Sequence, residues 1–216
     1  MGHPASDSRR RFLSRGAGVA AGLALAGLLG ACSRNSAKLA RLASDAVVLA
    51  FGDSLTFGTG AANGQSYPAQ LERMIGRKVV ASGIPGEVSA AGLARLPAVL
   101  DEVRPKLVVL CHGGNDILRR MSDGQTADNL KAMIRLIKSR GADVILIGVP
   151  KPGLFPSTAD FYGDVAGEFG IPYEDGVLKK VLTDSSLKSD AVHPNGLGYG
   201  KVAEAVSNIL RSSGAI

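Results

Sequence analysis

The chain has few cysteines for disulfide bonds, only a short apolar run and few clustered basic residues that could bind nucleic acid. Two cysteines among 216 residues allow one disulfide at most. Its longest apolar run, residues 16–30, is shorter than the ~20 residues that a transmembrane helix needs. Four arginines in the first fifteen residues supply much of the +6 charge, and the remainder has no basic stripe with interleaved aromatics, which excludes a nucleic-acid partner. With 45% hydrophobic and 20% charged residues, one globular domain is expected.

The first 31 residues have the layout of an export signal: a basic stretch, the apolar run, then small residues before Cys32. Residues 8–13 are similar to a twin-arginine signal, and residues 29–32 to a bacterial lipobox, whose cysteine becomes lipidated. We therefore expect residues 1–31 to be a twin-arginine-type lipoprotein signal peptide, residues 32–45 a tether lipidated at Cys32, and residues 46–216 the domain. This predicts a membrane-anchored lipoprotein of the cell envelope, on the periplasmic face. A signal cut near Ala26 or Ala31 without lipidation, or an uncleaved anchor, is the alternative.

From residue 46 onward, short apolar runs alternate with helical patterns, which is typical of a parallel sheet covered by helices. The sequence predicts strands at 46–52, 78–81, 107–112 and 144–149, with a weaker one at 171–173. It predicts helices at 67–75, 90–103, 127–140, 159–169 and 196–211. A sheet of this kind binds its ligand at the carboxyl ends of its strands, where turns 52–55, 83–86 and 113–116 would meet.

Ser54, in the first of these turns, is the candidate nucleophile. A serine hydroxyl needs a base to take its proton and a third group to orient that base. Beyond the leader the only histidines are His112 and His193, and the Asp190-x-x-His193 spacing lets one turn present a carboxylate and an imidazole. The sequence therefore predicts Ser54, His193 and Asp190 as catalytic residues. Thr56 stands where a Gly-x-Ser-x-Gly elbow has glycine, which disfavours the α/β-hydrolase fold.

Acyl transfer also needs hydrogen-bond donors for the developing oxyanion. The candidates are the backbone N–H groups of Ser54 and Gly86 and the side-chain amide of Asn115. Singly, these residues are more often a helix cap, a turn glycine and a loop-bonding amide. Their occurrence together with Asp190 and His193 favours an oxyanion hole.

Other polar residues in the same turns are expected to be structural. Asp53 should hold the first turn and Asp116 the third. Cys111 and His112 are adjacent in a predicted strand, so they point to opposite faces, and no further ligands follow at metal spacing. We expect no metal and no cofactor, and, if Cys32 carries lipid, no intrachain disulfide for Cys111.

Ser54, Gly86, Asn115 and His193 occur in four blocks in the order that defines the SGNH (GDSL-type) hydrolase family, which the chain resembles. Residues 92–97 (GLARLP) and 113–116 (GGND) most resemble its bacterial multifunctional arylesterase/thioesterase/lysophospholipase group. The resemblance implies a flavodoxin-like three-layer α/β/α sandwich with a five-stranded parallel sheet in the order 2-1-3-4-5. It also implies ester or thioester hydrolysis without a cofactor, by a monomer. Ala81 and Pro85 depart from the common Asn and Ser, which puts the shape of the second turn in question.

The apolar, proline-rich loop 150–160 is expected to govern the choice of substrate. In the resembling group this loop borders an acyl groove, so Leu154 and Phe155 are candidate substrate contacts, unless they pack within the loop. The predicted substrates are aryl and short-to-medium acyl esters, with thioesters and lysophospholipids as further candidates. Two alternatives remain: a carbohydrate O-acetylesterase, and a non-catalytic binding lipoprotein on the same scaffold.

Overall fold

The computed structural model of the protein describes residues 37–153 and 156–216. The expected signal peptide, the expected lipidation site Cys32 and the expected substrate contacts Leu154 and Phe155 lie outside these described residues. Within the described ranges, no helix combines the length and the apolar character needed to span a bilayer.

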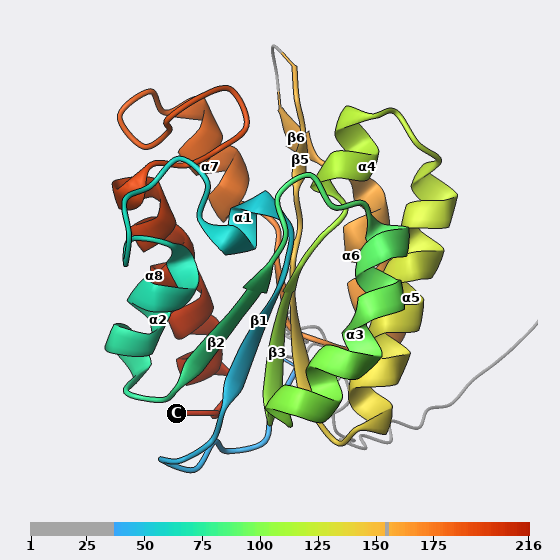
Figure 1. Cartoon of the computed structure of the whole chain (residues 1–216), viewed down its shortest axis with the longest axis vertical. Coiled ribbons are helices and arrows are strands. Elements are labelled where there is room, and N and C mark those ends of the chain that lie inside the picture. Colours follow the sequence, from blue (N-terminus) through green and yellow to red (C-terminus); the bar gives the residue numbers. More distant parts are fainter. Residues whose placement is uncertain (1–36, 154–155) are drawn as a thin grey trace, which may run out of the picture. The chain divides into compact units, whose positions relative to one another are not determined.

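A five-stranded parallel sheet forms the centre of the fold (Figure 1). Its order is β2-β1-β3-β4-β7, which confirms the predicted order, with β7 as the fifth strand. Every residue of β1 and β3 is buried, as expected for strands covered on both faces. A separate two-stranded hairpin follows β4. The strands are β1 (Val48–Gly52), β2 (Val79–Gly83), β3 (Leu107–Cys111), β4 (Asp143–Ile147), β5 (Pro150–Lys151), β6 (Ser157–Thr158) and β7 (Tyr173–Glu174).

Helices cover both faces of this sheet, in the predicted three layers. Figure 1 shows α2, α7 and α8 on one face and α3, α5 and α6 on the other. Helix α5 begins four residues before its predicted start, because the Ser122 hydroxyl caps it by accepting the N–H of Gln125 at 3.3 Å. The helices are α1 (Ser54–Phe57), α2 (Tyr67–Ile75), α3 (Ser89–Val103), α4 (Gly114–Leu118), α5 (Asp123–Ser139), α6 (Asp160–Phe169), α7 (Val177–Thr183) and α8 (Gly196–Ser212).

The segment just before β1 packs against the amino end of the sheet. The N–H of Leu42 donates to the carbonyl of Ala215 at 2.8 Å, and that of Ala40 donates to the Asp143 carboxylate at 2.8 Å. The Leu42 side chain is buried in the core. The packed domain therefore begins before Ala46, where the sequence analysis placed its start. The partners of this segment are distant in the chain, so its packing leaves no local sequence pattern.

Candidate active site

Two very short helices begin directly after strands β1 and β3 and present polar groups at the carboxyl end of the sheet (Figure 1). Asp53 caps α1, since its Oδ1 accepts the N–H of Leu55 at 3.1 Å. Ser54 is the first residue of α1. The preceding Gly52 lies against the carbonyl of Cys111, where any β-carbon would overlap that oxygen. The first turn thus depends on glycine at position 52, and the Asp53 side chain contributes to holding it through its bond to Leu55.

Ser54, His193 and Asp190 form one hydrogen-bonded chain. His193 Nε2 lies 3.0 Å from Ser54 Oγ, and His193 Nδ1 lies 2.8 Å from Asp190 Oδ2. Asp190 Oδ1 also accepts the N–H groups of Val192 and His193, both at 2.8 Å. A carboxylate can only accept, so Nδ1 carries the ring proton and Nε2 presents its lone pair to the serine hydroxyl. The structure brings together the three residues predicted from the sequence.

The carboxylate of Asp190 is kept ionised by its surroundings. Partial burial works against the charge, but the N–H of Val192 and the hydrogen bond and charge of His193 outweigh it and lower the pKa of Asp190 below its ordinary value. An ionised Asp190 can stabilise the imidazolium that forms when His193 takes a proton. The pKa of Asp53 is shifted in the other direction: burial raises it, although nearby imidazoles and the N–H of Leu55 oppose the shift.

Two backbone N–H groups near Ser54 are left without acceptors. Neither the Ser54 N–H nor the Gly86 N–H has a hydrogen-bond acceptor among residues 37–153 and 156–216. Gly86 has φ +79°, in the left-handed region that favours glycine, and a side chain there would be strained. Both residues line the same cleft as His193. They are in place to donate to an oxyanion formed at Ser54.

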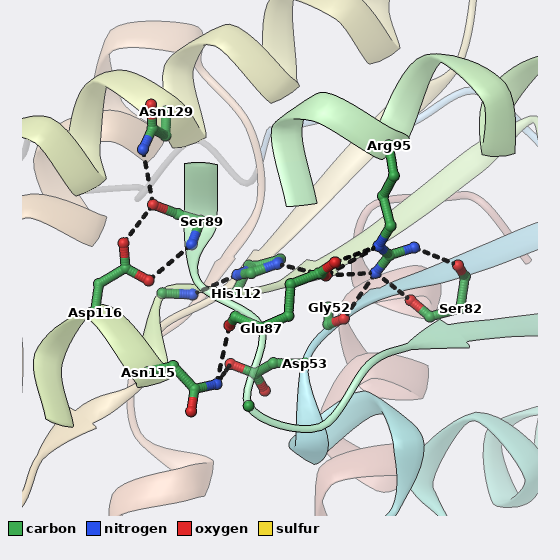
Figure 2. A network of polar contacts seen from close by, with 12 residues as sticks. Gly52, Asp53, Ser82, Glu87, Ser89, Arg95, His112, Asn115, Asp116 and Asn129 are labelled. Atoms are coloured by element: carbon green, nitrogen blue, oxygen red, sulfur yellow. Dashed lines mark hydrogen bonds and ion pairs between the residues drawn. The ribbon is translucent and has the colours of Figure 1, made fainter. Parts of the chain in front are cut away.

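The Asn115 amide lies beside this pair but is already engaged (Figure 2). Its Nδ2 donates to the carbonyl of Glu87 at 3.0 Å and to Asp53 Oδ2 at 3.3 Å. An amide nitrogen has two hydrogens, so donation to an oxyanion requires that one of these bonds be given up. The bond to Asp53 is the longer and therefore the weaker of the two.

The cleft over Ser54 has a volume of about 480 Å³. Its polar lining includes Ser54, Asn115 and His193, and two lysines, Lys151 and Lys188. Most of its remaining wall is apolar, contributed by α1, α4, the loop after β4, α7 and the loop before His193. These wall residues are Leu55, Leu118, Val149, Pro150, Pro152, Pro156, Leu182 and Val192. The sequence analysis anticipated the loop after β4 but missed the contributions of α4 and α7.

The remaining polar residues of the turns make contacts within the fold. Asp116 accepts the N–H of Ser89 at 2.8 Å and its hydroxyl at 2.5 Å, which joins the third turn to the start of α3. Cys111 is buried, and burial raises the pKa of its thiol well above the ordinary value, so it is a poor nucleophile. In the described part of the chain, no group of three or more His, Cys, Asp or Glu side chains is arranged to hold a metal ion.

Comparison with known proteins identifies the family of this chain. The model of the GDSL-like Lipase/Acylhydrolase family matches residues 50–201, so the chain belongs to this family and is a GDSL-type hydrolase. It is 32% identical to Esterase TesA of Pseudomonas aeruginosa over 184 residues, covering 80% of this chain and 92% of that protein. It is 31% identical to Thioesterase 1/protease 1/lysophospholipase L1 of Escherichia coli, covering 72% and 78%. A crystal structure of TesA superposes with a TM-score of 0.70 at 30% identity, covering 77% of this chain and 99% of the other.

Proposed function

We propose that this protein is a serine esterase that hydrolyses carboxylic esters through an acyl-enzyme on Ser54. The observation that carries the proposal is the chain of hydrogen bonds from Ser54 Oγ to His193 Nε2 at 3.0 Å and from His193 Nδ1 to Asp190 at 2.8 Å. Ser54 and His193 line a cleft large enough for an acyl chain.

In the first step, Ser54 Oγ attacks the ester carbonyl carbon as its proton passes to His193 Nε2. The tetrahedral intermediate collapses when the imidazolium returns that proton to the leaving alcohol, which leaves an acyl group on Ser54. In the second step a water molecule attacks the acyl carbon, again losing its proton to His193. The imidazolium returns this proton to Ser54 Oγ as the second tetrahedral intermediate collapses, which releases the Ser54 hydroxyl and the carboxylic acid. Asp190 holds the imidazole in the required tautomer and stabilises its charge throughout.

The oxyanion of both intermediates is bound by the N–H groups of Ser54 and Gly86 and by the Asn115 amide. The two backbone groups need no rearrangement because they have no competing acceptor among the described residues. Asn115 exchanges its 3.3 Å bond to Asp53 for a bond to the oxyanion and keeps the 3.0 Å bond to Glu87. In an enzyme where one such donor was removed, the loss of transition-state stabilisation was roughly 3 to 4 kcal/mol.

The apolar wall of the cleft favours substrates with aryl or short-to-medium acyl groups. Thioesters and lysophospholipids are further candidates, since a relative carries both activities in its name. Hydrolysis rates should be measured on p-nitrophenyl acetate, butyrate, hexanoate and octanoate, with Ser54→Ala alongside. We expect an optimum at butyrate or longer and no activity in the variant. Acetate as the best substrate would instead support a carbohydrate O-acetylesterase with a small pocket.

We further propose that the protein is exported and anchored to the cell envelope through a lipid on Cys32, with its domain on the periplasmic side. The support is the arginine-rich, apolar and small-residue order of residues 1–32. Membrane fractionation and intact-mass measurement provide the test. The mature protein should carry lipid on Cys32, and Cys32→Ala should move it to the soluble fraction. An unmodified cysteine in a membrane-bound protein would contradict the assignment.

A further inference from the structure

A largely buried ion pair between Arg95 and Glu87 lies close to Asn115 and His112 (Figure 2). The guanidinium of Arg95, on α3, donates to both carboxylate oxygens of Glu87, with Nε 2.7 Å from Oε1 and Nη2 2.7 Å from Oε2. The side chain of Glu87 is only 6% exposed and that of Arg95 20%. Burial disfavours the charge of Glu87, but the hydrogen bonds from Arg95 and His112 overcome it and lower its pKa. Glu87 is therefore a carboxylate held in one orientation.

His112 connects this pair to the third turn. Its Nδ1 accepts the N–H of Gly113 at 2.9 Å, so the proton is on Nε2, which donates to Glu87 Oε2 at 3.1 Å. The ring is fully buried, and Gly92 lies so close to Nε2 that any β-carbon there would overlap it. The carbonyl of His112 is held by the Tyr162 hydroxyl at 2.7 Å. The imidazole cannot rotate or change tautomer without losing one of these bonds.

Arg95 connects the same pair to the first turn. Its Nη2 donates to the carbonyl of Gly52 at 3.1 Å, and its Nη1 donates to the Ser82 hydroxyl at 2.7 Å. The guanidinium also stacks 4.0 Å from the ring centroid of Phe51. Gly52 is two residues before Ser54, and Ser82 is on β2, at the entry to the second turn. Thus Arg95 reaches two of the three turns that carry oxyanion donors.

All three donors are therefore tied to the group formed by Arg95, Glu87 and His112. The Gly86 N–H is one residue from Glu87, the Asn115 amide donates to the Glu87 carbonyl at 3.0 Å, and Ser54 follows Gly52. We propose that Glu87 is a positioning residue: held by Arg95 and His112, it sets the spacing of the oxyanion donors without touching the substrate. Glu87 is absent from the residues that line the cleft. The proposal rests on the proposed esterase function of the same site.

Glu87→Gln in the full chain is the first test. Glutamine offers one acceptor oxygen. If that oxygen takes the place of Oε2, which accepts from both Arg95 and His112, the NH2 group takes the place of Oε1 and faces the Arg95 Nε–H, so donor meets donor and the paired bonds to Arg95 are lost. A displacement of the donors by a fraction of an ångström should lower kcat by about ten- to a hundredfold, with KM within about twofold of wild type. Active sites are counted by the final extent of labelling with a fluorophosphonate, so that kcat is expressed per reactive serine.

Per-site kinetics distinguish positioning from a general loss of structure. A merely structural role lowers the number of labelled sites and leaves kcat per site unchanged, whereas displaced donors lower the rate of labelling and not its final extent. Leu130→Ala is the matched control, since Leu130 is buried in α5 and does not line the cleft. It should reduce stability without changing kcat per site. An unchanged kcat per site in Glu87→Gln would overturn the proposal.

Arg95→Lys tests the other residue of the ion pair. Lysine keeps the positive charge but loses the paired hydrogen bonds to Glu87 and the bonds to Gly52 and Ser82. If Glu87 and Arg95 position the donors together, the double variant Glu87→Gln/Arg95→Lys should lose little more kcat per site than the more impaired single variant. Multiplicative losses would contradict a shared role. Ester hydrolysis and the rate of labelling test the two proposals separately. A wild type that hydrolyses no ester would refute the proposed function. The labelling rates of the variants would still decide whether Glu87 positions the site.

Discussion

Asn115→Ala tests the oxyanion hole most sharply, because it removes one donor and leaves the nucleophile and base intact. Loss of such a donor costs about 10²–10³ in kcat, or roughly 3 to 4 kcal/mol. The variant also deprives Asp53 Oδ2 and the Glu87 carbonyl of a hydrogen bond. Such bonds contribute about 1 kcal/mol each, and more when the acceptor is charged, so the free energy of unfolding should fall by about 2 to 4 kcal/mol. Against a typical stability of about 5 to 15 kcal/mol, the variant stays folded.

The assay is steady-state hydrolysis of p-nitrophenyl butyrate per fluorophosphonate-labelled serine, with unfolding in urea measured in parallel. Asn129→Ala is the matched control, since Asn129 is a buried amide that donates to Ser89 Oγ at 2.9 Å and lies outside the cleft. It should lose stability but keep its kcat per site. The reasoning is refuted if kcat of Asn115→Ala stays within about threefold of wild type, or if Asn129→Ala loses as much.

Three further variants probe the packing and charges around the site. Leu42→Ala should lower the free energy of unfolding in urea titrations by about 2 to 3 kcal/mol, because Leu42 is buried. Its kcat per site should be unchanged. An unshifted urea midpoint would contradict the packing of this segment. In Gly86→Ala the new Cβ meets only the Arg119 guanidinium, at 4.0 Å, but the residue keeps a φ of +79°. The variant should therefore lose about 1 to 2 kcal/mol of stability and lower kcat by turning the N–H, and an equal kcat would argue against that donor. Since the pKa of Glu87 is lowered in the folded state, its contribution to stability is present above its unfolded pKa of about 4.3 and is lost as pH falls through the folded pKa. The stability difference between wild type and Glu87→Gln should therefore be largest near neutral pH and shrink toward pH 3, and a difference independent of pH would contradict the sign.

The long strands were predictable because each contains a short apolar run between helical patterns, whereas their order in the sheet was predicted only from the resemblance to the SGNH hydrolase family. The residues around Ser54 were predictable because the turns after β1, β2 and β3 must meet at one edge of a parallel sheet. The helices α1 and α4 could not be predicted, since four or five residues are too short to show a helical period. Strand β7 has only two residues, which explains its weak signal.

Contacts between distant parts of the chain account for most of what the sequence analysis missed. Leu42 bonds to Ala215, and nothing in residues 32–45 signals such a partner. Glu87 follows the predicted donor Gly86, but its importance lies in Arg95 and His112, which reach it from α3 and the end of β3. A pattern of residues shows which groups can do the chemistry, whereas the groups that hold them in place become visible only in three dimensions.

The central claim is that Ser54 is an activated nucleophile. The most direct measurement is the mass of the protein from Ser33 onward, which keeps every described residue, after reaction with a fluorophosphonate, alongside ester hydrolysis by wild type and Ser54→Ala. The account predicts one added phosphonyl group on Ser54, loss of hydrolysis in step with labelling, and neither reaction in the variant. Labelling at another residue, or ester hydrolysis that persists in Ser54→Ala, would contradict it.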